Sequence, residues 1–369
     1  MMIAEKIRRK FSVTAPVFIA TDEASVKLER KPYLQPFENE LAMRELTALL
    51  DPEDTVREEC GLHIVRTAKS DEYLRQSLTF WQRVGRVHLE PTVQKALEFT
   101  QNGVVQTKER SKLHNARRLR YGPHDLHEYR GKFFPQLVRS LINIARAPAN
   151  AVVFDPMCGS GTTLCEAVAA GRSGIGADLN PLSVLISSVK AALPMEDPAE
   201  FAATTTRFIS EFKFKSVSPS KVWNKDDLRY LGMWFDPAAL DDLAAVLAKI
   251  RAIRRPIYRD FFYVCLSNII RSVSWQKESD LRVRKEIQPY DRGTVGSRFV
   301  ELATKQIDRI YAYLCVLPRP ALRPTLDIRH GNAVCVATMF PEYVGKVDLL
   351  ITSPPYATAL PYLDTDRLS

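Results

Sequence analysis

One stretch, from Ala151 to Lys190, constrains the fold of this 369-residue chain more than any other. It begins with an apolar run, Ala151 to Phe154, of the kind that a buried parallel strand requires. A turn that contains Gly159 and Gly161 follows, and an amphipathic helix leads from it to Gly171. The chain then returns in a second short strand that ends on an acid. This order of strand, glycine turn, helix, strand and acid is typical of a nucleoside-binding unit. In such a unit the backbone of the glycine turn comes close to the bound nucleoside.

Glycine-rich turns after strands also bind NAD, FAD or free phosphate. In this chain the turn reads Cys158-Gly159-Ser160-Gly161, which does not have the GxGxxG spacing, and no GK[ST] sequence follows it. The spacing therefore disfavours a dinucleotide site and a P-loop.

A second motif lies far downstream. The apolar run from Val347 to Thr352 predicts another buried strand, and Ser353-Pro354-Pro355-Tyr356 follows it directly. The two prolines could simply end a strand, because proline cannot continue a hydrogen-bonded ladder. They acquire a chemical meaning only together with the first motif.

Taken together, DPMCGSGTT (155–163), GADLNP (176–181) and SPPY (353–356) resemble the motifs of S-adenosylmethionine-dependent DNA amino-methyltransferases. The resemblance implies a Rossmann-like α/β sheet, S-adenosylmethionine as cofactor, and site-specific methylation of an exocyclic amino group in DNA. The serine form of the last motif is associated most often with cytosine N4 and less often with adenine N6. The cofactor-binding residues that these motifs imply are Asp155, Pro156, Gly159, Gly161, Thr162, Thr163 and Asp178.

Each of these residue types suits one part of the cofactor. The resemblance implies that Asp178 binds the ribose hydroxyls, as the acid of dinucleotide sites does. The glycine turn and the helix start at Thr162 and Thr163 would face the methionine carboxylate, because the amino end of a helix favours negative charge.

Two further segments resemble the same family. His127 to Pro135 has the pattern HxYxxKFxP, which in the family packs beside the methionine end of the cofactor, so Lys132 is expected to meet a carboxylate and Phe133 to form an apolar wall. These aromatics could equally anchor the start of a helix. Asn332 stands where the family often has Asp, and its amide oxygen can accept a hydrogen bond from the adenine amino group.

The catalytic role falls to the SPPY motif. An exocyclic amino group is a poor nucleophile because its lone pair is delocalised into the ring. Ser353 Oγ and the Pro354 carbonyl would accept its two hydrogens and turn the lone pair toward the methyl group. Pro355 helps to fix that carbonyl, and Tyr356 would stack on a base flipped out of double-stranded DNA.

The composition is compatible with a polyanionic partner. Net charge is +9, and basic residues are dense in Lys108 to Arg120 and in the polar stretch Trp275 to Phe299. Either segment could contact phosphate or could be a solvated surface. The six cysteines form no CxxC pair, so neither a metal site nor a disulfide framework is predicted, and a cytoplasmic location without membrane attachment is expected.

The domain organisation expected from these patterns has two parts. Residues 1–120 are predicted to be an N-terminal helical and basic region, with helical spacing in 73–84 among other stretches. Residues 121–369 are predicted to be the catalytic domain, with a helical insert at about 196–322 and about four of the seven strands of this fold, so that its C-terminal part is missing.

Two alternatives remain open. A tRNA guanine-N2 methyltransferase shares the DPxCGSGT motif but usually carries Asn or Asp before Pro-Pro-Tyr. The second alternative is an inactive or split fragment that needs a complementing C-terminal chain, and the isolated chain is then expected to have little or no activity.

Overall fold

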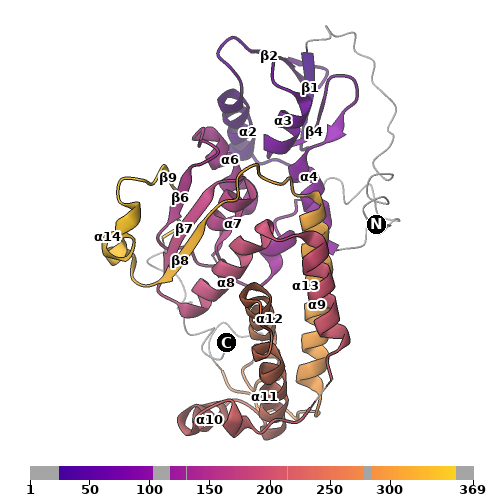
Figure 1. The fold of residues 1–369 in the computed structure, drawn as a ribbon. Helices are drawn as coiled ribbons and strands as arrows, with labels where there is room; N and C mark the ends of the chain where they lie inside the picture. Colours follow the sequence, from indigo (N-terminus) through magenta and orange to yellow (C-terminus); the bar gives the residue numbers. More distant parts are fainter. Residues whose placement is uncertain (1–24, 103–116, 130, 214, 278–283, 355–369) are drawn as a thin grey trace.

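The computed structural model describes residues 25–102, 117–129, 131–213, 215–277 and 284–354, which are organised around two separate sheets (Figure 1). One sheet is antiparallel and N-terminal, and the other is parallel and contains the motif strands. A group of long helices lies beside the parallel sheet.

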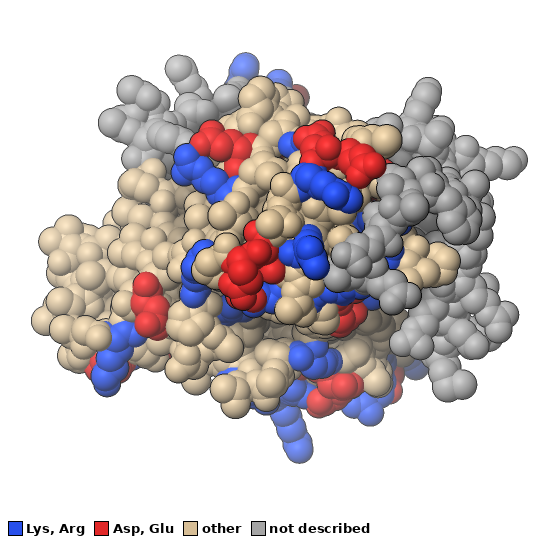
Figure 2. Space-filling model, turned by 90° about the horizontal axis from the view of Figure 1, so that it is seen from above, with Lys and Arg blue, Asp and Glu red and all other residues tan. Residues whose placement is uncertain are grey.

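The N-terminal sheet has five antiparallel strands in the order β2-β3-β1-β4-β5. Its strands are β1 (Ser25–Arg30), β2 (Thr55–Glu59), β3 (Leu62–Arg66), β4 (Trp81–Gly85) and β5 (Glu90–Pro91). The helices of this part are α2 (Pro36–Leu49), α3 (Asp71–Ser77) and α4 (Val93–Glu98), followed by the 3₁₀ turn η1 (Phe99–Asn102). Seen from above, Lys and Arg side chains on this end of the molecule are interspersed with Asp and Glu (Figure 2).

The prediction of an N-terminal helical region is therefore wrong for much of residues 25–102. The expected helix through residues 73–84 ends at Ser77, and the chain continues as strand β4. Trp81 and Val84 of β4 are fully buried against Leu28 of β1 and its neighbours. Contacts with a strand about fifty residues away decide this conformation, and a local periodicity does not reveal them.

The parallel sheet has four strands in the order β8-β7-β6-β9. They are β6 (Val152–Asp155), β7 (Ser173–Asp178), β8 (Leu326–His330) and β9 (Leu349–Leu350). Every pairing within this sheet is parallel. Strands β7 and β8 extend the sheet on one side of β6. The last strand in sequence, β9, pairs with the other side of β6. The prediction of a Rossmann-like α/β sheet with about four strands is confirmed.

Helices α6 (Pro135–Ile144), α7 (Thr162–Ala169) and α8 (Pro181–Ala192) accompany this sheet. Val138 and Ile142 of α6 pack against Val153 of β6, and Leu164 of α7 packs with Ala191 of α8. A separate cluster contains Phe154, Ile175 and Phe340, together with the short elements η6 (Ala333–Cys335), α14 (Val336–Met339) and η7 (Pro341–Tyr343).

The residues between α8 and β8 are helical. They form η3 (Leu193–Met195), α9 (Pro198–Ser210), η4 (Pro219–Lys221), α10 (Lys225–Leu231), α11 (Pro237–Arg251), α12 (Pro256–Ile269), η5 (Arg271–Val273) and α13 (Thr294–Val316). We call residues 211–293 the helical arm. Its helices α10, α11 and α12 extend past the carboxyl ends of the parallel strands, on the side opposite the N-terminal sheet (Figure 1).

The polar stretch that follows α12 and η5 differs in part from the expectation of a loop. Gln276 and Lys285 form an antiparallel bridge, and the backbone N–H of Lys277 donates to the Arg284 carbonyl at 2.8 Å. The last residues of the expected loop belong to α13, which begins at Thr294. We call residues 275–286 the ribbon; residues 278–283 at its centre lie outside the described part of the chain.

Candidate active site

The glycine turn after β6 adopts a conformation that requires glycine. Gly159 has φ 51° and Gly161 has φ 74°, both in the left-handed region. The backbone N–H of Cys158 donates to the Ala177 carbonyl at 2.9 Å, which ties the turn to the end of β7. The amino end of α7 follows at Thr162, so its first N–H groups lie next to the turn.

Asp178 ends β7 beside this turn. Its Oδ2 accepts from the Gly159 N–H at 2.8 Å and its Oδ1 accepts from the Asn180 N–H at 2.9 Å. The side chain is only partly buried, and a carboxylate has about four acceptor positions. Asp178 therefore shapes the glycine turn and retains acceptor capacity for a ligand.

Asp155 ends β6 in a closed environment. It is 3% exposed, and its Oδ1 accepts from the Met157 N–H at 3.2 Å across the half-buried Pro156. Burial raises the pKa of Asp155 to about 6, opposed by the nearby hydroxyls of Thr352 and Thr163. Both hydroxyls therefore lie close to the Asp155 carboxyl group and favour its charged form.

The SPPY motif begins at the same end of the sheet. Leu349 and Leu350 of β9 pair with Val153 and Phe154 of β6, and the Ile351 N–H donates to the Phe154 carbonyl at 3.1 Å. This register brings Thr352 beside Asp155, and the partly buried Ser353 follows it. Pro354 is exposed, whereas Pro355 and Tyr356 lie outside the described residues.

The structure places the HxYxxKFxP segment next to these elements. Lys132 Nζ donates to the main-chain carbonyl of His124 at 2.7 Å, and burial lowers the pKa of Lys132 to about 8. The expected carboxylate contact of Lys132 stays a prediction. Phe133 packs in the same apolar cluster as Leu349 and Ile351, and so contacts the strand that carries SPPY.

Asn332 follows β8 and lies near Asp178, because the Gly331 N–H donates to the Asp178 carbonyl at 3.0 Å. Asn332 is exposed, and its Oδ1 accepts from the Val334 N–H at 3.0 Å. The second acceptor position of that oxygen is the one left for an adenine amino group. Its predicted role stays a prediction.

Sequence reasoning missed two exposed apolar side chains at this edge. Leu179 directly follows Asp178 and is 60% exposed, and Val334 lies two residues after Asn332 and is 88% exposed. The ends of β7 and β8 are joined here by His330 Nε2 and the Leu179 carbonyl, 3.0 Å apart. The sequence signal that could have found them is an apolar residue one or two positions after each predicted polar ligand of the cofactor, Asp178 and Asn332.

Tyr129 is a third residue missing from the predicted set. A Cβ built on Gly159 would lie 3.2 Å from the Tyr129 ring, so the ring lies directly over the glycine turn. The Tyr129 hydroxyl lies 3.0 Å from Ser183 Oγ on α8. The tyrosine of the HxYxxKFxP pattern was the available signal.

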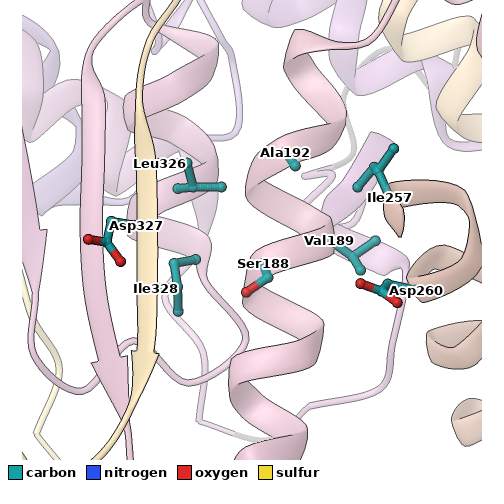
Figure 3. Close-up of a pocket in the computed structure, with 8 residues that line it drawn as sticks. All are labelled: Ser188, Val189, Ala192, Ile257, Asp260, Leu326, Asp327 and Ile328. Atoms are coloured by element: carbon teal, nitrogen blue, oxygen red, sulfur yellow. The ribbon is translucent and has the colours of Figure 1, made fainter. Parts of the chain in front are cut away.

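One cavity lies away from this edge. It has a volume of about 360 Å³ and lies between α8, α12 and β8 (Figure 3). Leu326 and Ile328 point from β8 toward α8, and Asp260 of α12 lies at the opposite side (Figure 3). None of the predicted site residues lines the cavity. Within the described ranges, no group of three His, Cys, Asp or Glu side chains could hold a metal ion, and no helix is long and apolar enough to cross a membrane.

The strand order, the left-handed glycine turn and the acid that ends the neighbouring strand define a Rossmann-like methyltransferase fold. Residues 33–187 match the family model of the DNA methylases, whose members use S-adenosylmethionine as methyl donor. The resemblance to DNA amino-methyltransferases is thereby confirmed.

Two curated relatives support the same assignment. The type II methyltransferase M.MvaI of Kocuria varians is 23% identical over 263 residues, which cover 67% of this chain and 56% of that protein. The type II methyltransferase M.MjaII of Methanocaldococcus jannaschii is 40% identical over 67 residues, or 18% of this chain and 12% of that protein. The match thus spans only about half the length of M.MvaI and a smaller part of M.MjaII.

Among solved structures, the rRNA methyltransferase aviRa of Streptomyces viridochromogenes covers 70% of this chain and 70% of its own chain at 15% identity. Its TM-score is 0.27, so the assignment of the fold rests on the topology of the sheet and not on this likeness.

Proposed function

We propose that this chain transfers a methyl group from S-adenosylmethionine to an exocyclic amino group in DNA, with cytosine N4 as the expected acceptor. The observation that carries the proposal is the pairing of β9 with β6. It brings the start of SPPY to the same sheet edge as the glycine turn and Asp155, although nearly 200 residues separate the paired segments.

The residues of this edge fit the cofactor. Gly159 and Gly161 give the turn its left-handed backbone, and the buried Thr163 hydroxyl lies near Asp155. Asp178 would hold the ribose, Asn332 the adenine, and the α7 amino end the methionine carboxylate. When bound, S-adenosylmethionine would supply the electrophilic methyl group.

The chain's own residues would act mainly by orientation. Ser353 Oγ and the Pro354 carbonyl would accept the two hydrogens of the amino group, which redirects its lone pair toward the incoming methyl. The half-buried position of Ser353 beside the closed environment of Asp155 limits the access of water to this group. Tyr356 would stack on the flipped base.

DNA is favoured over tRNA as substrate by a specific observation. The family model that matches this chain is that of the DNA methylases, and both relatives described above are named type II methyltransferases. Cytosine is placed ahead of adenine because Ser353 stands in the first position of the tetrapeptide. No relative supports a complementing chain, and we do not propose one.

We further propose that the helical arm contacts the DNA. The arm extends past the carboxyl ends of the strands, which is the side where the glycine turn and Ser353 lie (Figure 1). It contains 16 Lys and Arg against 11 Asp and Glu. Arg284 and Lys285 of the ribbon are exposed, and Lys285 Nζ lies 4.9 Å from the centroid of the Trp275 ring. Such a combination of cations and an aromatic suits a nucleic acid.

The test is methyl transfer by the purified chain from S-adenosylmethionine with a tritiated methyl group. Duplex DNA and tRNA are offered separately, and the labelled bases are identified after digestion by mass spectrometry. We expect N4-methylcytosine from DNA. N6-methyladenine would shift the assignment to adenine, and N2-methylguanine from tRNA would overturn the proposal.

A further inference from the structure

One face of α8 is polar although it is fully buried. Ser183 and Ser187 are 0% exposed and Lys190 is 2% exposed, and their spacing of four and then three residues places them on one side of the helix. Buried polar groups are costly unless they have partners. The partners of this face are therefore informative.

The three residues contact Tyr129, the glycine turn and the start of α7, respectively. Ser183 Oγ lies 3.0 Å from the hydroxyl of Tyr129. Ser187 packs so tightly on the turn that a Cβ on Gly161 would lie 2.6 Å from the Ser187 Cβ. Lys190 Nζ donates to Thr162 Oγ1 at 2.9 Å, in the first turn of α7.

Lys190 has no carboxylate in direct contact. Glu166 of α7 is the acid whose charge acts on it, but Glu166 lies 2.7 Å from His124 Nε2, and within the described part of the chain no carboxylate forms an ion pair with Lys190. Burial, reinforced by the charge of Lys132, lowers the pKa of Lys190 to about 7. A buried ammonium that is bound only to a hydroxyl is an expensive arrangement, and an apolar residue of the same shape would avoid its cost.

We propose that Lys190 is a positioning residue, whose buried ammonium holds Thr162 and the first turn of α7 and balances the carboxylate of the bound cofactor. This inference rests on the proposed function, because the carboxylate is that of S-adenosylmethionine. The amino end of α7 attracts an anion through its N–H groups, and Lys190 adds a full positive charge behind them. The bound carboxylate then adds to the negative charge that Glu166 alone supplies in the free protein.

A pH dependence follows from this arrangement. A carboxylate at the α7 amino end favours the charged form of Lys190 and raises its pKa, so the cofactor binds with uptake of a proton. Affinity is then highest below pH 7 and falls as the pH rises from 7 to 9. The other titratable groups that face Lys190 are Glu166 and Cys165 of α7, His124 of η2 (Gly122–Asp125), and Lys132.

Because Lys132 and the cofactor's own amino group titrate in the same range, the contribution of Lys190 is read as a difference between variants. Lys190→Met keeps the length of the side chain and removes its charge. Lys305→Met, at an exposed position of α13, is the matched control. Binding of S-adenosylmethionine to the full chain is measured by calorimetry at pH 7 in two buffers of different ionisation enthalpy.

We expect the wild type and Lys305→Met to take up about half a proton more than Lys190→Met, since a group with a pKa near 7 is half charged at that pH. For Lys190→Met the affinity also falls about tenfold, and the melting temperature of the free protein does not fall. Thr162→Val is expected to weaken binding as well, and the double variant is expected to be no worse than Lys190→Met alone.

The outcomes separate this inference from the proposed function. Binding by Lys190→Met with wild-type affinity and proton uptake would overturn the positioning role and leave the methyltransferase assignment intact. Additive losses in the double variant would overturn the action through Thr162. If Lys190→Met does not fold, Lys190→Gln is measured in the same way. A folded wild-type chain that does not bind S-adenosylmethionine would overturn the proposed function together with this inference.

Discussion

The N-terminal sheet and the helical arm flank the catalytic sheet at opposite ends and differ in charge (Figure 1). Residues 25–102 contain 11 Lys and Arg against 13 Asp and Glu, whereas residues 211–293 contain 16 against 11. The net positive charge of the chain is thus not spread evenly. Part of the excess lies in the arm, which extends on the side of Ser353 and the glycine turn, where a polyanion would have to lie.

The cations of the N-terminal part are largely paired with its own acids. Lys69 Nζ lies 2.7 Å from Asp51, and the buried Lys31 lies 2.5 Å from Glu98. Asn143 of α6 donates to the buried Glu45 at 2.8 Å, which joins this part to the catalytic sheet. Such contacts indicate that the N-terminal part supports α6. The exposed cations on the ribbon of the arm indicate instead an interface with a polyanion. The comparison teaches that total charge is a poorer guide than where the unpaired charge lies.

The largest effect is expected in the core of the N-terminal sheet. Trp81 is 0% exposed, and Trp81→Ala should lower the free energy of unfolding by about 3–5 kcal/mol, through lost apolar contact and the cavity left behind. Chemical denaturation measures the change. Val87→Ala, at a position 82% exposed in the same part, should change it by less than about 0.5 kcal/mol. Similar losses for both would contradict a structural role based on this core.

Ser353→Ala should show the opposite behaviour, with loss of turnover and no loss of stability. Removing one polar group that acts on the reacting centre costs about 10²–10³-fold in rate. Single-turnover transfer of tritiated methyl measures the rate, and calorimetry measures the affinity for S-adenosylmethionine, which should not change. Equal losses in rate and affinity would mean that Ser353 only supports the fold.

Asp178→Ala should weaken cofactor binding by about 1.5–3 kcal/mol, because it removes a charged acceptor from the ribose and releases the Gly159 N–H from its partner. Calorimetric titration with S-adenosylmethionine is the measurement. Asp178→Asn keeps an acceptor oxygen and should lose less. An unchanged affinity in both variants would place the cofactor elsewhere.

The smallest expected effect compares the contributions of the ribbon and of the N-terminal part to DNA binding. Replacing the exposed Arg284 and Lys285 of the ribbon by Ala should weaken DNA binding about tenfold at moderate salt and reduce its salt dependence. The same change at Arg44 and Arg57, exposed in the N-terminal part, should leave the affinity unchanged. Fluorescence anisotropy with a labelled duplex over a range of salt concentrations gives both values. A larger loss from the N-terminal pair would reverse the assignment of the interface.

Much of the catalytic sheet could be predicted from the sequence because its determinants are local. The apolar run before Asp155, the glycines that tolerate positive φ, and the acid at the end of β7 each act over a few residues. The helical periodicity of α11, α12 and α13 is local in the same sense, and all three lie within the insert expected to be helical at about 196–322. Asp178 and the glycine turn are where the motifs predicted them.

Other features depended on partners that are distant in the sequence. The N-terminal strands pair with partners tens of residues away in the sequence. The local spacing of apolar residues does not reveal such pairing, and on its own it predicts a helix. The polar face of α8 reads as an ordinary helix until the structure shows Lys190 against Thr162, and Lys132 turns to the His124 carbonyl. The contact of the Val152 N–H with Asp348, at 2.8 Å across 196 positions, belongs to this class. The conformation of the glycine turn is encoded locally, whereas burial and strand pairing arise only when distant segments meet. For this reason tertiary structure alone decided which residues lie against the glycine turn.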